Sequence, residues 1–195
     1  KVASVSHSIN NRILRVDLTE GRTWIEEPGM EFYRKYVGGR MFIAHYLLKE
    51  LPKDADPLGP ENMLIFAAGP VTGTPVPGNA RHSVGAKSPM SGMYGESEAG
   101  GYWGAELKSA GWDGIIFTGK AEKPVYLWIK DDAVEIRDAA HLWGKITGDV
   151  EAELREEVDD NRVRVAQIGP AGENLVRFAC IVNDLNEFAG RAGIG

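Results

Sequence analysis

The sequence contains a single cysteine, Cys180, among its 195 residues, so no disulfide can form within the chain. The same scarcity excludes a metal or iron–sulfur site held by several cysteines of this chain. One thiol suits a reducing compartment, and we expect a cytoplasmic location. Cys180 alternates with Phe178 and Val182 in an apolar stretch, which predicts a small buried residue in a strand.

Long apolar runs and basic clusters are also missing. No segment reaches the roughly 20 apolar residues of a membrane-spanning helix, and the first residues lack the apolar core of a signal peptide. Lys and Arg number 22 against 28 Asp and Glu, without a basic stripe. We therefore expect neither membrane insertion nor nucleic-acid binding. Because no initiator Met is present, residues 1–11, with His7, are expected to be a tail or tag remnant, and 12–195 one domain.

Glycine is abundant, with 24 residues. Most of them gather in four clusters: 69–78, 92–104, 169–172 and 190–195. Such clusters mark tight turns or close approach of the backbone to a ligand. In the second cluster, Ala99-Gly100-Gly101 precedes a helix predicted from Trp103, Leu107 and Ala110 and ended by Gly111. Free N–H groups at this entry suit an anion, although a plain turn before a helix is the commoner meaning of one glycine pattern.

Hydrophobic periodicity predicts short strands and helices. Two hairpins are expected, Ile13–Leu18 with Thr23–Glu27 and Val125–Lys130 with Val134–Arg137 around Asp131-Asp132. Further strands are expected at Met63–Ala68, Ala80–Lys87, Gly114–Gly119, Arg162–Ile168 and Asn174–Val182. Besides the helix from Trp103, helices are expected at Glu31–Tyr36, at Phe42–Leu51 after a break at Gly38-Gly39-Arg40, and at Thr147–Val158 with Thr147 as N-cap.

These elements predict an α+β fold of mainly antiparallel β-sheets, a sandwich or pseudo-barrel, with about four helices. Two segments are alike, since IFAAGP at 65–70 and VAQIGP at 165–170 each end a strand with a Gly-Pro turn before a glycine loop and a further strand. Their spacing of about a hundred residues is too long for a solenoid repeat but fits two related halves. A coincidence of two Gly-Pro turns explains the pattern equally well.

The titratable side chains form no recognisable catalytic pattern. The four histidines lack metal-ligand spacing, and His45 falls on the polar face of its predicted helix. Glu96, Glu98 and Asp113 suggest a carboxylate pair, but nothing in the sequence fixes the distances between them. The sequence therefore assigns no catalytic residue.

Seven blocks of sequence stand in one order between Arg12 and Gly195. They are RILRVDLTEG, DPLGPENMLIFAAGPVTGT, KSPMSG, GGYWGAELKSAGWDGIIFTGKAEKPVYLWI, VEIRDAAHLWGK, IGPAGENLVRFA and AGRAGIG. With these blocks the chain resembles the N-terminal domain of the aldehyde ferredoxin oxidoreductase family of tungsten or molybdenum pterin enzymes. The resemblance implies a base for two pterin dithiolenes that share one metal, with a magnesium ion bridging their phosphates. It also implies a [4Fe–4S] cluster whose cysteines lie in later helical domains outside this chain.

The resemblance also assigns cofactor contacts. The arginine that links pterin to cluster corresponds to Arg81. The other contacts correspond to Glu98, Ala99, Gly100 and Gly101, and to Glu187, Phe188, Ala189, Gly190 and Arg191. The main-chain carbonyls of Glu98 and Phe188 correspond to magnesium contacts. Better-known members have Asn, Arg and Ala where this chain has Glu98, Glu187 and Phe188, and a carboxylate at 187 repels phosphate.

The activity that the resemblance implies is oxidation of a small aldehyde to a carboxylic acid, with electrons passed through the cluster to ferredoxin. The metal–pterin carries this chemistry, the domain positions it, and catalytic residues are expected in the later domains. Those domains would dock on an exposed apolar face, and a homodimer is also compatible with such a face. Two alternatives stay open: the tungsten subunit of a ring-reducing acyl-CoA reductase, and a cofactor-free interaction domain. The retained glycines and Arg81 argue against the second, because glycine is costly where no ligand needs it.

Overall fold

A computed structural model describes residues 8–195 of the protein, and the expectations placed on residues 1–7, including His7, lie outside this part. The predicted α+β class is confirmed. Five helices accompany three open sheets of six, three and two strands within residues 8–195. In this range no helix is long and apolar enough to cross a membrane.

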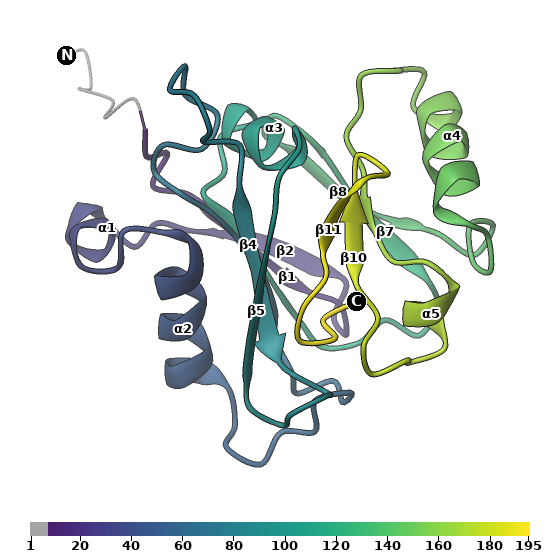
Figure 1. The fold of residues 1–195 in the computed structure, drawn as a ribbon, viewed down its shortest axis with the longest axis horizontal. Coiled ribbons are helices and arrows are strands. Elements are labelled where there is room, and N and C mark those ends of the chain that lie inside the picture. Colours follow the sequence, from purple (N-terminus) through teal and green to yellow (C-terminus); the bar gives the residue numbers. More distant parts are fainter. Residues whose placement is uncertain (1–7) are drawn as a thin grey trace.

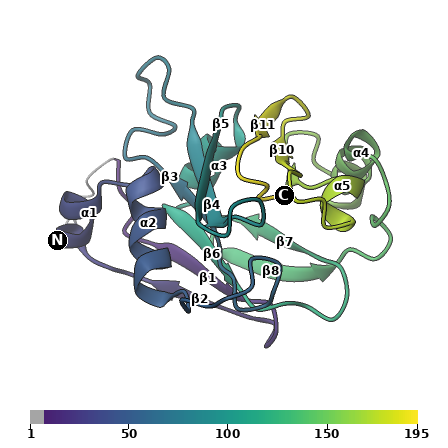
Figure 2. The ribbon, with the colours of Figure 1, turned by 60° about the horizontal axis from the view of Figure 1, so that its bottom comes forward.

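The six-stranded sheet has the order β2-β1-β6-β3-β4-β5 (Figures 1 and 2). Its strands are β1 (Ile13–Asp17), β2 (Arg22–Glu26), β3 (Leu64–Ala68), β4 (His82–Lys87), β5 (Tyr94–Ala99) and β6 (Gly114–Thr118). Neighbours pair antiparallel except β1 and β6, which are parallel. β6 therefore joins the predicted hairpin β1–β2 to the antiparallel strands β3, β4 and β5.

Two helices, α1 (Met30–Tyr36) and α2 (Gly39–Glu50), pack beside this sheet (Figure 2). Side chains of α2 and of the sheet form a core in which Phe42, Ile65 and Ile116 are almost fully buried. The predicted break at 38–40 is wrong in part, because α2 begins at Gly39. Val37 and Gly38, with φ of 62° and 155°, interrupt the helices. Gly38 cannot carry a side chain, because a Cβ there would lie 2.8 Å from the Ala68 carbonyl oxygen.

The helix α3 (Trp103–Ser109) agrees with its prediction, and Gly111 ends it with a φ of 94°. The strand before it, β5, was not predicted, because GESEA lacks the apolar residues of a typical strand. Its Gly95, Ser97 and Ala99 are buried. Only glycine fits at position 95, because a Cβ there would lie 2.7 Å from the Cβ of Ala192.

The remaining elements form a second assembly. β7 (Val125–Lys130) and β8 (Ala133–Asp138) make the second predicted hairpin. They are followed by α4 (Thr147–Glu157), α5 (Pro170–Glu173) and the antiparallel strands β9 (Ala166–Gln167), β10 (Ile181–Asn183) and β11 (Glu187–Ala189). Thr147 is the first helical residue and makes no side-chain cap, so its assignment as N-cap is wrong.

The strands predicted at 162–168 and 174–182 are wrong over most of their length. Only β9 and the first two residues of β10 are paired there, while Pro170 starts a helical turn, a position that suits its fixed φ. Cys180 therefore lies outside any strand and is half-buried, not buried as expected. Phe178, its predicted neighbour on the same face, is 73% exposed.

The order of elements repeats along the chain. The first half runs from hairpin β1–β2 through α2 to β3, a Gly-Pro turn, β4 and β5. The second half runs from hairpin β7–β8 through α4 to β9, a Gly-Pro turn, β10 and β11. The two sets of three antiparallel strands meet where β5 lies against β11 (Figure 1). This arrangement supports two related halves over a coincidence of Gly-Pro turns.

Candidate functional site

The fold brings together the two segments assigned to the cofactor, although they are far apart in the sequence. The Nδ2 of Asn183, opposite Glu187 in the β10–β11 pair, donates to the Gly100 carbonyl at 3.0 Å. The Arg191 backbone N–H donates to the Ser97 hydroxyl at 3.2 Å. Residues 98–101 and 187–191 therefore border one shared region at the junction of the two halves.

Two arginines give this region its positive charge. Arg81 comes directly before β4. Because His82 pairs with Ala99 of β5, Arg81 lies at the level of Gly100. The side chains of Arg81 and Arg191 are exposed, and neither has an ion-pair partner within the described range 8–195. Unpaired guanidinium groups beside glycine backbone suit bidentate binding of a phosphate group.

The charge of Glu98 is balanced within the protein. Its Oε1 lies 2.6 Å from Nη2 of Arg40 on α2, and Glu96 lies 3.9 Å from the same nitrogen. This hydrogen bond with Glu98 raises the pKa of Arg40 above its ordinary value. Glu98 therefore faces the α2 side of β5 as part of an ion pair, and its carboxylate is not left to repel an anion.

Glu187 has a different environment. No ion-pair partner approaches it among residues 8–195, and its Oε2 lies 2.7 Å from where a Cβ of residue 100 would be. The space left by the missing side chain at Gly100 is therefore taken by the Glu187 carboxylate and not by a ligand. At Gly190, by contrast, an added Cβ would meet nothing closer than 4.0 Å. The open glycine backbone of the region is therefore at 190, beside the half-exposed Phe188.

The entrance to α3 is already bound by a carboxylate of the chain. Asp184 Oδ2 accepts hydrogen bonds from the N–H groups of Tyr102 at 2.7 Å and Trp103 at 3.3 Å. These groups follow Gly101, where an anion site was expected. Sequence reasoning missed Asp184, because an acidic residue shortly after a predicted strand gives no sign of which helix it contacts. An external anion must therefore use other groups.

His82 points into the core and not toward this region. Its ring forms a cluster with those of Phe66 and Trp103, and neither ring nitrogen has a hydrogen-bond partner in the described structure. Burial lowers its pKa to about 4. His82 is therefore a neutral core residue at pH 7. His45 is likewise structural: it is half-buried, and its ring centroid lies 4.3 Å from that of Tyr36.

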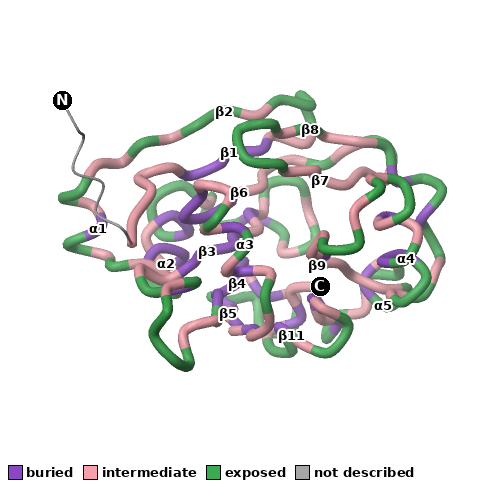
Figure 3. Tube along the Cα trace, turned by 90° about the horizontal axis from the view of Figure 1, so that it is seen from above, coloured by how far each residue is buried: buried purple, intermediate pink, exposed green. Residues whose placement is uncertain are grey.

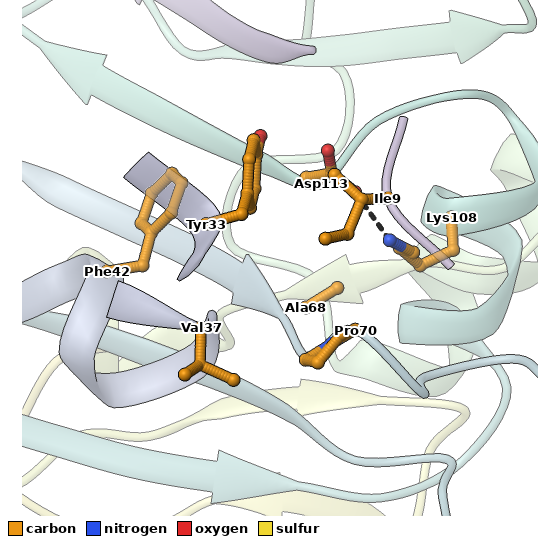
Figure 4. Close-up of a pocket in the computed structure, with 9 residues that line it drawn as sticks. Ile9, Tyr33, Val37, Phe42, Ala68, Pro70, Lys108 and Asp113 are labelled. Carbon is orange, nitrogen blue, oxygen red and sulfur yellow. Dashed lines mark hydrogen bonds and ion pairs between the residues drawn. The ribbon is translucent and has the colours of Figure 1, made fainter. Parts of the chain in front are cut away.

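Asp113 does not form a carboxylate pair with Glu96 or Glu98. Its Oδ1 lies 2.5 Å from Lys108 Nζ (Figure 4). The same oxygen accepts the N–H of Asn10 at 3.1 Å. Figure 4 shows this ion pair beside Tyr33 and Ile9, and the side chains leave no volume there for a ligand. The pair ties residues just before β1 to the end of α3, which is a structural role.

The donor set at the junction fits a phosphate-bearing ligand better than a directly bound metal. Within residues 8–195, no three His, Cys, Asp or Glu side chains converge on one metal position. The region instead offers backbone groups and the guanidinium groups of Arg81 and Arg191. These suit the phosphate groups of a pterin cofactor, with the open backbone at Gly190 allowing a flat ring system to approach.

Comparisons with known proteins identify the family of the chain. The family profile described as "Aldehyde ferredoxin oxidoreductase, N-terminal domain" matches residues 13–195. Tungsten-containing aldehyde ferredoxin oxidoreductases of Thermococcus kodakarensis and Pyrococcus furiosus are 53% and 52% identical over 184 residues. Each alignment covers 94% of this chain and 30% of the relative. The chain thus spans about a third of the length of these relatives.

A solved structure is also similar. It is described as the active-site complex BamBC of benzoyl coenzyme A reductase with 1,5-dienoyl-CoA, and it matches with a TM-score of 0.93 and 41% identity. The match covers 96% of this chain and 28% of that chain. Together with the profile match, these similarities establish that the chain belongs to the aldehyde ferredoxin oxidoreductase family, whose N-terminal domain it represents.

Proposed function

We propose that this chain is the cofactor-binding domain of a tungsten-containing aldehyde ferredoxin oxidoreductase. The reaction of the whole protein converts an aldehyde and water into a carboxylic acid, two protons and two electrons. The electrons leave through a [4Fe–4S] cluster to ferredoxin, and the cluster ligands lie in the remaining domains of the polypeptide. The names and the extent of the relatives support this assignment.

The junction of the two halves carries the proposal. Two glycine segments from different halves border one region, and it is flanked by two arginines that have no ion-pair partner among residues 8–195. A tungsten bis-pterin supplies the two-electron chemistry when it is bound. Arg81 and Arg191 would hold its phosphates, and the backbone at Gly190 would lie against a pterin ring. The carbonyls of Glu98 and Phe188 are proposed to contact the magnesium ion.

The test is metal analysis of the full-length protein, purified without oxygen. We expect about one tungsten or molybdenum and about four irons per chain, as one bis-pterin metal and one [4Fe–4S] cluster require. Arg81→Ala and Arg191→Ala should each lower the tungsten content while the protein stays folded. Arg34→Ala is the matched control, since Arg34 is an exposed arginine on α1, and should keep full content.

Two results would contradict the proposal. Iron without tungsten or molybdenum in the wild-type protein would favour a domain that has lost its cofactor. Unchanged tungsten content in both arginine variants would show that the cofactor does not use this region. The 195-residue chain alone should show no aldehyde oxidation, because it lacks the cluster ligands and part of the pocket.

The solved structure named above favours a second candidate, the tungsten subunit of a ring-reducing acyl-CoA reductase. Both candidates predict the same metal content, so substrate decides between them. We expect the full-length protein to reduce a viologen acceptor with a small aldehyde. Electron transfer to an aryl-CoA thioester, without aldehyde oxidation, would favour the reductase.

A further inference from the structure

Two side chains at the junction of the halves present oxygen acceptors to the same small space. Asn183 and Glu187 are directly opposite each other in the β10–β11 pair, so their side chains leave the sheet on one face. Glu187 Oε2 lies 2.7 Å from where a Cβ of residue 100 would be, and Asn183 Nδ2 lies 2.8 Å from where a Cβ of residue 101 would be. Both side chains therefore face the glycine backbone of the first half.

The amide of Asn183 is buried and only half satisfied. Asn183 is 1% exposed, and its Nδ2 donates to the Gly100 carbonyl at 3.0 Å and to Asp184 Oδ2 at 3.1 Å. These two bonds fix the orientation of the amide, because the flipped amide would place its oxygen against two acceptors. Oδ1 then has no donor among residues 8–195. A buried amide oxygen without a donor is costly, so we expect a donor from outside the described chain.

The carboxylate of Glu187 also lacks a partner in the described range. Its neighbour Asp184 is compensated, since it accepts the N–H of Tyr102 and lies 3.4 Å from Nη1 of Arg164. Glu187 is half-buried and makes no hydrogen bond or ion pair within residues 8–195. A phosphate group bound nearby does not help, because it is itself an anion and an acceptor. The space therefore calls for a species that is positively charged and donates hydrogen bonds.

A count of charges, which rests on the proposed function, identifies this species. Two cofactor phosphates bring about three to four negative charges near neutral pH. Arg81, Arg191 and one magnesium ion bring about four positive charges. The sum is close to zero before Glu187 is counted. The Glu187 carboxylate therefore stays ionised at low cost only where it faces the divalent cation.

We propose that Glu187 and Asn183 hold the water shell of the magnesium ion at the cofactor phosphates. Mg²⁺ loses its water reluctantly and usually keeps several water molecules, each of them a strong donor. One such water donates to the Glu187 carboxylate and another to Asn183 Oδ1. The carbonyls proposed to contact this ion come from the same two segments, because Phe188 follows Glu187 and Glu98 precedes Ala99-Gly100. Glu187 and Asn183 are thus positioning residues of the cation.

Other donors explain these observations less well. An ion pair of Glu187 with Arg81 would leave Asn183 Oδ1 without a donor and would withdraw an arginine from the phosphates. The ring N–H and amino groups of a pterin lie at the end of the ring system away from its phosphate. Glu187 instead lies at Gly100, the level of the phosphate-binding Arg81. Water on a cation reaches both acceptors and removes neither arginine.

The first test is the magnesium content of the full-length protein, purified without oxygen and dialysed against increasing concentrations of EDTA. Magnesium, tungsten and iron are measured together by mass spectrometry. Glu187→Gln keeps the shape of the side chain and removes its charge. We expect this variant to release magnesium at an EDTA concentration about tenfold lower than wild type, since partners of metal ligands contribute about 10–100-fold to metal affinity. Glu31→Gln, at an exposed glutamate on α1, is the matched control and should behave like wild type.

The outcomes separate this inference from the proposed function. Equal release of magnesium from Glu187→Gln and from wild type, with tungsten retained in both, would overturn the role of Glu187 and leave the proposed function intact. A wild-type protein without tungsten or molybdenum would overturn the proposed function and this inference with it.

The second test needs no substitution and is a high-resolution structure of the full-length protein with its cofactor. We expect waters bound to the cation at about 2.5–3.0 Å from the Glu187 carboxylate and from Asn183 Oδ1, the usual range for such hydrogen bonds. An ion pair between Glu187 and Arg81, a pterin amino group against Glu187, or a cation whose waters contact neither side chain would each overturn the inference.

Discussion

β1 and β7 are the first strands of two equivalent hairpins, yet their surroundings differ. Figure 3 shows β1 largely buried and β7 intermediate in exposure. β1 is flanked by β2 and β6, whereas β7 has β8 alone within the described residues. The difference shows that a hairpin pattern in the sequence specifies the local turn and pairing. How far the strands are buried depends on a third strand that lies elsewhere in the chain.

The largest difference in lost stability is expected between substitutions of an arginine in each of the two hairpins. Arg15 in β1 is buried, with Nε 2.6 Å from Glu26 and Nη1 2.7 Å from Glu50. Arg15→Ala leaves two partly buried carboxylates without a partner and should lower the free energy of unfolding by about 3–5 kcal/mol. Arg137→Ala in β8 removes a partly exposed ion pair with Glu135 and a contact with the Trp128 ring, and should cost at most about 1 kcal/mol. Equal destabilisation of both variants in thermal unfolding would contradict the comparison.

Leucines of β1 and β7 give the next largest difference in lost stability. Leu14 is 1% exposed, and Leu14→Ala should cost about 2–5 kcal/mol, as expected for a buried leucine. Leu127 in β7 is half-buried, so Leu127→Ala in the 195-residue chain should cost about 1 kcal/mol. Urea unfolding of the two variants measures this difference. If the two costs were equal, β7 would already be packed as tightly as β1.

The low-pH stability of the first half should depend on His82. Its pKa of about 4 lies below the ordinary value of 6.5, because burial disfavours the charged ring. As the pH falls from 6.5 to 4, the unfolded chain binds a proton that the native chain does not. Stability is therefore complete above 6.5 and decreases on acidification, by about 3 kcal/mol once the pH is below 4. His82→Phe should remove this part of the pH dependence of the free energy of unfolding, measured by urea titration at several pH values. An unchanged dependence between pH 6.5 and 4 would contradict the assignment to His82.

Some elements of the fold could be predicted from the sequence and others could not. The hairpins, α3 and its glycine end follow from periodicity and turn residues, which act over a few positions. β5 and the limits of β9 and β10 did not follow, because these strands depend on which neighbours pair with them. The short polar stretch GESEA is a strand because β4 lies beside it, while the apolar alternation at 162–165 is unpaired.

The candidate site shows the same limit. The resemblance placed two segments at the cofactor, and the fold brings them together. Single-residue environments were not predictable, since the partner of Glu98 is Arg40, 58 positions away, and Asp184 binds the start of α3 from 81 positions beyond Trp103. The contact of Glu187 with Gly100 was also not predictable, because it joins residues of the two different halves.

The smallest expected effect concerns the link between the halves. Asp184, with a φ of 51°, joins the β10–β11 turn to the N-terminus of α3. Asp184→Ala removes this cap and places alanine in left-handed backbone, and the loss should be about 2 kcal/mol. Asp184→Asn is the matched variant, because asparagine tolerates this backbone and keeps an oxygen acceptor, so it should lose less than half as much. Urea unfolding measures both, and equal losses would show that the negative charge, and not the cap or the backbone, joins the second half to the first.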